Sequence, residues 1–490
     1  MVPSLIEFTT SSNPPNSEPQ IKLSPSIQTV VDEIHKENPK LSPLIQQFYQ
    51  PMQARVDPPL ESIWVYTALT FRSRNHPKGD ILDRIAAAKD LFQLLSSCSA
   101  PCGSSKSVAL LAPVVRLAHD VVLDLFKREL GGLKKEKKEV KNLVGVILRF
   151  ISVCCSSRDS GQEEPLIDSS SGWSFSGLSC VWLNRDENVR NLLPLVSEEV
   201  IGGLRERDGD VSYLAGVVIA EVFLLRLCLN CKAGTSGEVL ETELRTWAVG
   251  SITGFQNVYV FDVLLRMLLE KTLPVTSLLS SEDEVLLRKV LYDAIILVEY
   301  SFLNPEKAIH ISAEHMKIIA MRRLILAHEA VEYFREHGDQ RRSISYTTAF
   351  SGSQLYSQIV KWVKNQIPVE DSSVKSEGTS PKALIKWLLN LERQGFLAFG
   401  DSILKYHSLD MSKPPASKLD SNEVDEDPIF YIDNKRRGEH TDDGKVNEYI
   451  SAAFLAAANT MTSAEKRGKK RKGENSESEE ESSLSDEDSE

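Results

Sequence analysis

Residues 100–107 place a lysine and a serine at the spacing that phosphate-binding loops use. Such a loop needs glycines, because only a chain without side chains lets successive backbone N–H groups wrap around the phosphates. Lys106 and Ser107 match the end of that motif, but Ser105 and Ala100 stand where its two glycines are needed. No strand is predicted before this segment. We therefore expect no nucleotide site here.

Two further patterns have spacings that metal sites use. His328 and Glu332 can share one helix face, but a zinc-binding helix needs a second histidine at the fifth position. Cys228 and Cys231 have the spacing of a metal or redox pair, but they end a strongly apolar helix. We interpret the first two as surface residues and the cysteines as small core side chains. No metal ligand is predicted.

No catalytic residue and no cofactor site is predicted either. The sequence contains neither a Gly-x-Ser-x-Gly elbow nor a Gly-x-Gly-x-x-Gly loop, and no arrangement singles out a nucleophile. His310 and His315 are expected at the surface. An enzyme with an unrecognised site is the third of three functional hypotheses. Four tryptophans on apolar stripes are expected in the core rather than stacked on bases: Trp64, Trp247, Trp362 and Trp387.

A dense basic cluster near the C-terminal end can bind an acidic partner. The surrounding composition predicts a segment that does not fold, so its cations stay accessible. Clusters of this kind act as nuclear import signals or contact nucleic acid, the alternative being a solvated charge run. We expect an import receptor to bind it, which predicts a nuclear location. The cluster consists of Lys466, Arg467, Lys469, Lys470, Arg471 and Lys472.

Residues 474–490 alternate serine with acidic residues. Four serines have an acid three positions later, which is similar to the pattern preferred by acid-directed kinases such as casein kinase 2. Phosphorylation would add about −1.5 to −2 charges at each site. A basic segment followed by an acidic, serine-rich one resembles the tails of nucleolar and chromatin-associated proteins, which implies a phosphoprotein of the nucleus or nucleolus. The expected phosphorylation sites are Ser476, Ser478, Ser483 and Ser485.

Composition limits the remaining classes. The chain has 490 residues and a formal net charge of −12, so it shows no global basic bias towards nucleic acid. Residues 1–25 lack the basic start and apolar core of a secretory signal. The seven cysteines are therefore expected to be reduced, in the cytosol or nucleus.

The most apolar run of the chain is residues 208–231, which we interpret as one helix. Asp208 or Asp210 can cap its start, and the segment 232–234 contains the lysine and glycine that suit its end. The run is long enough to span a membrane, but Glu221 and Arg226 would each cost roughly 2.5–3.5 kcal/mol at a bilayer centre. We expect a buried core helix and no membrane contact.

Helical periodicity dominates the rest of the chain. Helices are predicted to start near residue 26 and to follow over 41–49, 59–69, 81–95, 108–130, 140–155, 173–183, 188–204, 238–252, 258–271, 282–303, 313–337, 354–366 and 381–394. Pro51 is expected to end the second helix, Pro113 can kink the one in which it lies, and Ser281 with Glu284 can cap another. Residues 98–107 are expected to form a loop, and residues 338–350 a polar break.

The predicted fold is all-α and multi-helical, with helix pairs stacked in an irregular α-solenoid of the HEAT or armadillo kind. No fixed repeat signature is present. The predicted parts are a disordered segment 1–25, a helical block 26–156, an exposed loop 157–172, a second block 173–404 packed on the first, a charged linker 405–445, an amphipathic helix 446–461 and a disordered basic-then-acidic tail 462–490.

The first functional hypothesis is a non-enzymatic nuclear scaffold or adaptor whose helical body binds protein partners. Residues 321–323 and 328–329 mix charge with apolar surface and are expected to line such a face. The alternative is a protein associated with RNA or chromatin, which would hold phosphates through the lysines and arginines of 134–141, 435–437 and 466–472. The acidic balance and the lack of a known nucleic-acid module count against it.

Overall fold

The computed structural model describes residues 25–396, except 37, 55–56, 75–78, 129–133, 157–174, 184–188, 207–209, 233–236, 305–311 and 367–379. By internal contacts the chain divides into two units, Met1–Lys413 and Pro414–Glu490, and every described residue belongs to the first. The expected segments 1–25, 157–172 and 405–490 lie outside the described residues, except for Pro25, the first residue of α1. They include the basic cluster and the four serines.

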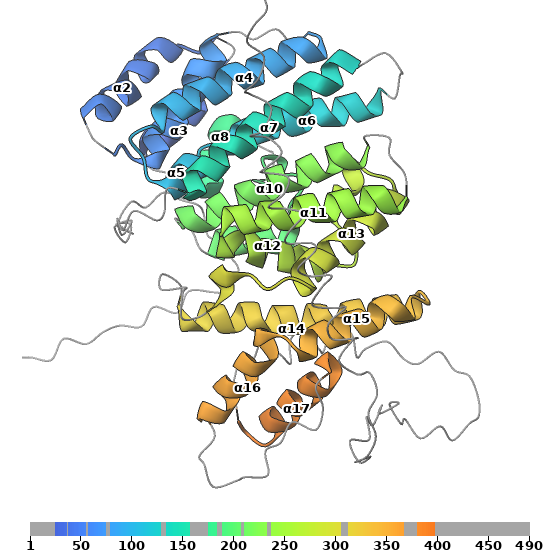
Figure 1. Ribbon diagram of the computed structural model, residues 1–490. Helices are drawn as coiled ribbons and strands as arrows, with labels where there is room; N and C mark the ends of the chain where they lie inside the picture. The colour runs from blue at the N-terminus through green and yellow to red at the C-terminus, as the bar shows by residue number, and fades with distance from the viewer. Residues whose placement is uncertain are drawn as a thin grey trace, which may run out of the picture. The chain divides into compact units, whose positions relative to one another are not determined.

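Every element of the described residues is helical, which confirms the all-α prediction (Figure 1). The α-helices are α1 (Pro25–Ile34), α2 (Leu41–Ala54), α3 (Leu60–Ser73), α4 (Ile81–Cys98), α5 (Ser104–Ala109), α6 (Ala112–Lys127), α7 (Lys134–Ser156), α8 (Phe175–Trp182), α9 (Glu198–Glu206), α10 (Val211–Cys231), α11 (Glu238–Phe255), α12 (Val258–Leu268), α13 (Ser281–Ile296), α14 (Ala313–Glu336), α15 (Gln340–Ser351), α16 (Gln354–Gln366) and α17 (Pro381–Arg393). Short 3-10 turns are η2 (Val189–Asn191), η3 (Pro274–Ser277) and η4 (Ser301–Leu303).

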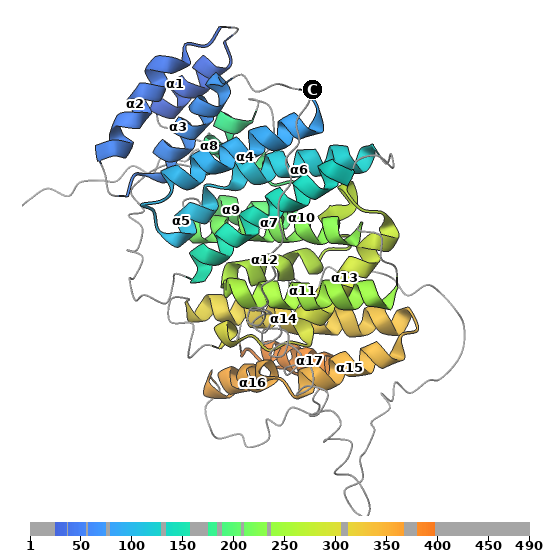
Figure 2. The same ribbon diagram turned by 45° about the horizontal axis from the view of Figure 1, so that its top comes forward.

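Helix α10 is the central helix, and the helices around it cover almost its whole surface. It contacts α5, α6, α7, α9, α11, α12 and α13, and it lies between α7 and α12 in Figure 1 and Figure 2. Among the described helices it alone is long and apolar enough to cross a membrane, yet 89% of its most apolar window is buried inside the protein. The prediction of a buried core helix is confirmed.

The ends and charges of α10 are satisfied as a core helix requires. The side chain of Asp210 accepts a hydrogen bond from the backbone N–H of Tyr213 at 3.0 Å. Glu221, buried in mid-helix, accepts the backbone N–H of Leu195 with both carboxyl oxygens at 2.9 Å. Arg226 donates to the backbone carbonyl of Lys141 at 2.8 Å. The two ionisable side chains that disfavour a membrane span thus have hydrogen-bond partners within the protein.

Helix α14 separates two hydrophobic cores. The larger core is continuous from α1 to α15 and includes Ile319, Leu326 and Phe334 of α14. The smaller core joins other α14 residues, among them Met321 and Leu324, to α15, α16 and α17. Because both cores are packed against it, α14 is buried on more than one side.

Prolines act differently from the prediction. The helix predicted over 108–130 is two helices, α5 and α6, with Pro113 in the first turn of α6, where its missing N–H costs nothing. Pro51 lies inside α2, and the packing of α2 against α3 offsets the lost backbone hydrogen bond.

The expected loop 98–107 is shorter, because α4 and α5 extend into it. Residues 188–204 form η2 and α9 rather than one helix.

The predicted polar break at 338–350 is wrong, because residues 340–351 form α15. Asp339 starts the helix by accepting the backbone N–H of Arg342 at 3.0 Å. One face of the helix is buried although the sequence is largely polar, and its buried residues are Ser343, Tyr346 and Phe350.

Helix α13 begins and ends earlier than predicted. Its cap is Ser280, not Ser281: the Ser280 hydroxyl accepts the backbone N–H of Asp283 at 3.3 Å and donates to the Asp283 carboxylate at 2.8 Å. The helix ends at Ile296, and η4 begins at Ser301. Residues from 299 to 304, in and around η4, form one wall of a cavity.

Candidate functional site

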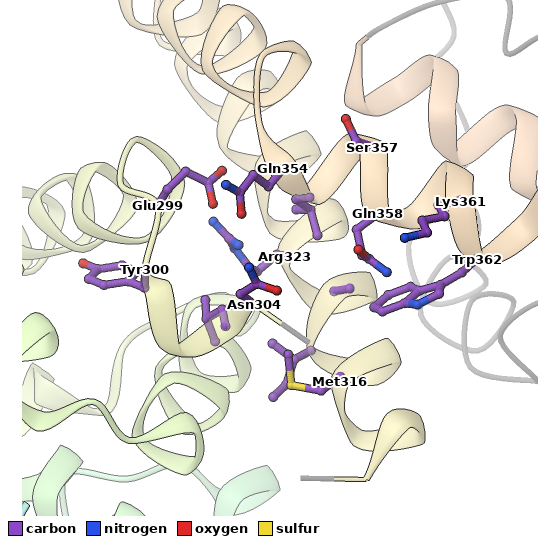
Figure 3. Close-up of a pocket in the computed structure, with 14 residues that line it drawn as sticks. Glu299, Tyr300, Asn304, Met316, Arg323, Gln354, Ser357, Gln358, Lys361 and Trp362 are labelled. Carbon is purple, nitrogen blue, oxygen red and sulfur yellow. The ribbon is translucent and has the colours of Figure 1, made fainter. Parts of the chain in front are cut away.

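A cavity of about 280 Å³ lies between the η4 segment, α14 and α16 (Figure 3). Its wall combines apolar and polar side chains from these three elements. The lining residues are Glu299, Tyr300, Leu303, Asn304, Met316, Ile319, Ala320, Arg323, Gln354, Leu355, Ser357, Gln358, Lys361 and Trp362.

Helical spacing brings the polar residues of α16 to one side of the cavity. Gln354, Gln358 and Lys361 are separated by four and three residues, so they follow one another along a single helix face. Leu355 and Trp362 lie next to this row and contribute apolar surface. The smaller core holds α16 against α14, which fixes the distance between the two walls.

Arg323 is the most deeply buried cation of the cavity wall. Its side chain is drawn among those of Glu299, Asn304 and Gln354 in Figure 3. Only 8% of the residue is exposed, and its guanidinium lies 5.5 Å from the ring centre of Phe261. No hydrogen bond or ion pair joins that guanidinium to another residue of the described part of the chain.

Burial governs the electrostatics of Arg323. Loss of solvation lowers the pKa of its guanidinium, and the negative charge of Glu299 opposes that shift. The quadrupole of the Phe261 ring contributes some attraction, but a ring does not accept the N–H groups of a guanidinium as an anion does. A buried cation without a hydrogen-bonded anion is stabilised when an anion enters the cavity.

The adjacent residue Arg322 shows the contrasting, paired arrangement. Its guanidinium donates to the fully buried carboxylate of Asp262. Arg266 donates to the same carboxylate at 3.2 Å, and Nε2 of His315 lies 3.8 Å away. Burial opposes the negative charge of Asp262, but Arg322 and Arg266 outweigh it and hold the pKa of that carboxyl below its ordinary value. This cluster holds α12 and α14 together.

A second buried cluster connects α13 to α15. The hydroxyl of Tyr346 donates to Asp293 at 2.6 Å, and guanidinium nitrogens of Arg245 and Arg342 lie 3.7 Å from the same carboxylate. Burial raises the pKa of Asp293 despite these partners. Arg342 also pairs with Glu241 of α11. All these groups have protein partners, so we assign the cluster a structural role.

The groups tested for metal or nucleophilic chemistry show no catalytic arrangement within the described residues. No group of three His, Cys, Asp or Glu side chains there could hold a metal ion. Nδ1 of the half-buried His328 lies 3.9 Å from the Glu332 carboxylate, one turn further along α14. Cys228 and Cys231 are buried free thiols, and burial raises the pKa of Cys231 to about 11. A thiol with a raised pKa is a poor nucleophile at neutral pH.

Several predicted site residues have a different environment. Met321 and Arg322, expected on a partner-binding face, are buried, whereas Arg323 lines the cavity. His315, expected at the surface, is buried beside Asp262, because the start of α14 packs on α12. Trp362, expected in the core, is half-buried and lines the cavity. The η4 wall has no distinctive sequence pattern.

No protein-family model, curated protein or solved structure matches the chain.

Proposed function

We propose that the protein is a nuclear, non-enzymatic α-helical adaptor whose body binds protein partners. The observation that carries this proposal is the cavity between η4, α14 and α16. It combines apolar floor, polar rim and one buried cation, which is the composition of a binding pocket for a side chain or a small group. Within the described residues it contains no nucleophile paired with a base.

The proposed architecture is an irregular α-solenoid. Helices that are adjacent or next but one in the sequence pack on one another in the described part of the chain: α2 on α3 and α14 on α15 are adjacent, and α4 on α6 and α11 on α13 are next but one. Stacking of this kind builds one continuous core from consecutive helix pairs. The enclosure of α10 by seven helices is the main departure from a regular two-layer stack.

The proposed nuclear location rests on the basic cluster. Replacing Lys469, Lys470, Arg471 and Lys472 with alanine should move the protein towards the cytoplasm, as measured by microscopy of a tagged chain. The control is the equivalent loss of four charges at Lys134, Lys135, Lys137 and Lys138, all exposed in the first two turns of α7. An unchanged nuclear signal in the first variant would remove the import proposal.

Purification of the tagged protein from cells, with and without RNase, tests the adaptor function. A set of proteins that remains bound after RNase treatment is expected and would identify the process in which the protein takes part. Loss of all partners with RNase would instead favour the nucleic-acid hypothesis.

The nucleic-acid alternative has one observation in its favour. Four lysines at the start of α7 are exposed, at the helix end where the backbone dipole does not stabilise cations. Such a group can contact phosphates. If it does, binding of the whole protein to RNA should weaken steeply with salt, and the four-alanine variant in α7 should reduce that salt dependence.

A further inference from the structure

We infer that the cavity between η4, α14 and α16 binds a single carboxylate group attached to an apolar group, supplied by an acidic residue of a partner protein. This inference rests on the proposed adaptor function and names the chemistry that the partner must carry.

The guanidinium of Arg323 is the group in the cavity that can bind an anion. It is buried and has no hydrogen-bonded anion among the described residues, although its neighbour Arg322 has one. Taking a cation out of water without a partner is unfavourable, so an anion that enters the cavity gains more there than at an exposed arginine. The planar fork of a guanidinium matches the two oxygens of a carboxylate.

The charge of the lining selects the kind of anion. Arg323 and Lys361 supply two positive charges and Glu299 supplies one negative charge, so the wall has a formal charge of +1. One carboxylate neutralises it. A phosphate dianion would leave an excess negative charge beside Glu299 in a partly apolar space, and a neutral ligand would leave the guanidinium unpaired.

The apolar floor selects what is attached to the carboxylate. Leu303, Met316, Ile319, Leu355 and Trp362 all line the cavity. Its volume of about 280 Å³ lies at the lower end of the range for small-molecule sites, roughly 300–1,000 Å³. The space therefore suits one or two side chains of a peptide, such as a glutamate beside a leucine or an aromatic residue. Gln354, Asn304 and Gln358 can bond the peptide backbone at the rim.

The test uses the full chain and an array of eight-residue peptides. Each peptide has a central glutamate flanked by leucine, isoleucine, phenylalanine, tryptophan or glycine, and each has a twin with glutamine at that position. We expect a subset with apolar neighbours to bind and their glutamine twins to bind about tenfold more weakly or worse. No discrimination between any glutamate peptide and its twin would overturn the inference.

Three variants connect binding to the cavity. Arg323→Met keeps the side-chain volume and should lower affinity for the best peptide by about tenfold or more. Lys361→Glu reverses an exposed charge on the rim and should also lower the affinity for this peptide. Lys364→Glu makes the same change on α16 outside the cavity lining and should leave the affinity unchanged. Equal affinity of the wild type and a folded Lys361→Glu or Arg323→Met protein would contradict the inference.

Competition distinguishes the sources of the anion. Free 3-phenylpropionate should displace the best peptide only weakly, and inorganic phosphate less well still. A free acid that binds as tightly as the peptide, or stronger competition by phosphate, would overturn the assignment to a partner carboxylate. The two proposals fail under different results. If Arg323→Met retains the RNase-resistant partners, the adaptor function stands and only the carboxylate inference falls. If the wild type has no RNase-resistant partner, the adaptor function fails.

Discussion

Glu221 has a carboxyl group in the middle of the core, where burial disfavours its charged form. The residue is fully buried, and burial raises the pKa of its carboxyl to about 8, although the backbone N–H of Leu195 opposes this shift. The folded state therefore binds a proton more tightly than the unfolded chain does. The stabilisation from that proton is complete below the ordinary pKa of 4.5 and is lost as the pH rises towards 8.

The variant Glu221→Gln tests this pH dependence. Glutamine resembles the protonated acid and can accept the N–H of Leu195, so the pH-dependent loss should disappear. The free energy of unfolding of the variant should exceed that of the wild type increasingly between about pH 5 and about pH 8, by about 1.4 kcal/mol per unit of pKa difference. Urea denaturation measures it. Glu243→Gln, an exposed change on α11, should leave the wild-type slope intact.

Tyr346 provides a second prediction about a buried pair. Its hydroxyl donates to Asp293 at 2.6 Å, and the next nearest partners of that carboxylate are 3.7 Å away. Tyr346→Phe removes the short bond and should lower the free energy of unfolding by about 1.5–3 kcal/mol. Tyr66→Phe, at a half-buried tyrosine in α3, is the matched control and should change it little. Similar losses of unfolding free energy in both variants would show that the hydrogen bond to Asp293 stabilises the protein no more than the hydroxyl of a half-buried tyrosine does.

Residue-level features were predictable where the interaction is local. The cap by Asp210 follows from this residue and its next neighbours in the sequence, and it is present. The pairing of Arg322 with Asp262 spans 60 residues, so no local pattern indicates it. The same reason explains why Arg323 could be noted as a charge on an apolar helix but not as part of a cavity.

At the scale of elements, Gly216 lies where α10 and α12 approach each other closely. A Cβ atom added there would lie 2.5 Å from Cβ of Tyr259 and 3.0 Å from its backbone carbonyl carbon. The glycine therefore allows α10 and α12 to pack in direct backbone contact. A side chain at this position must push the two helices apart.

Gly216→Ala should therefore destabilise the protein, by about 1–3 kcal/mol or more, as overpacking of a core does. Gly250→Ala is the matched control, because a Cβ atom there meets nothing within 4 Å. Alanine is the better helix former, so this change in α11 should raise the unfolding temperature slightly. The two melting temperatures, measured by circular dichroism, should move in opposite directions. A neutral Gly216→Ala would show that α10 and α12 have room to adjust.

Apolar periodicity predicted most helices, and it failed where only a narrow face is buried. The residues of α15 that face the core are spaced by three and four positions and include a serine, so the segment reads as polar. The prediction of one helix over 108–130, kinked at Pro113, was wrong for a different reason. A proline is compatible with a kinked helix and with the first turn of a new one, and only the packing of α5 and α6 distinguishes these cases.

For the molecule as a whole, the important feature is that α14 is shared by two cores of unequal size. The larger core extends over most of the described helices, whereas the smaller core consists of α14, α15, α16 and α17. The cavity lies where these cores meet, with α16 as one wall. The shape of the cavity therefore depends on the packing of the smaller core. The sequence alone could not indicate this division, because α14 contributes to both cores with one continuous apolar pattern.

Leu388→Ala in α17 tests whether the smaller core can open independently. Leu388 is 1% exposed within that core, and the truncation should cost about 2–5 kcal/mol locally. Hydrogen exchange should accelerate in α16 and α17 while the amides of α10 and α12 keep their protection. Leu225→Ala, at a fully buried position of α10, should instead accelerate exchange in α10 and α12. If Leu388→Ala accelerates exchange in α10 as strongly as in α17, the two cores unfold as one unit.

If exchange in α10 is unchanged, the smaller core opens independently. Binding at the cavity should then slow exchange in α16 and α17 selectively, because a ligand that bridges α14 and α16 stabilises the smaller core first.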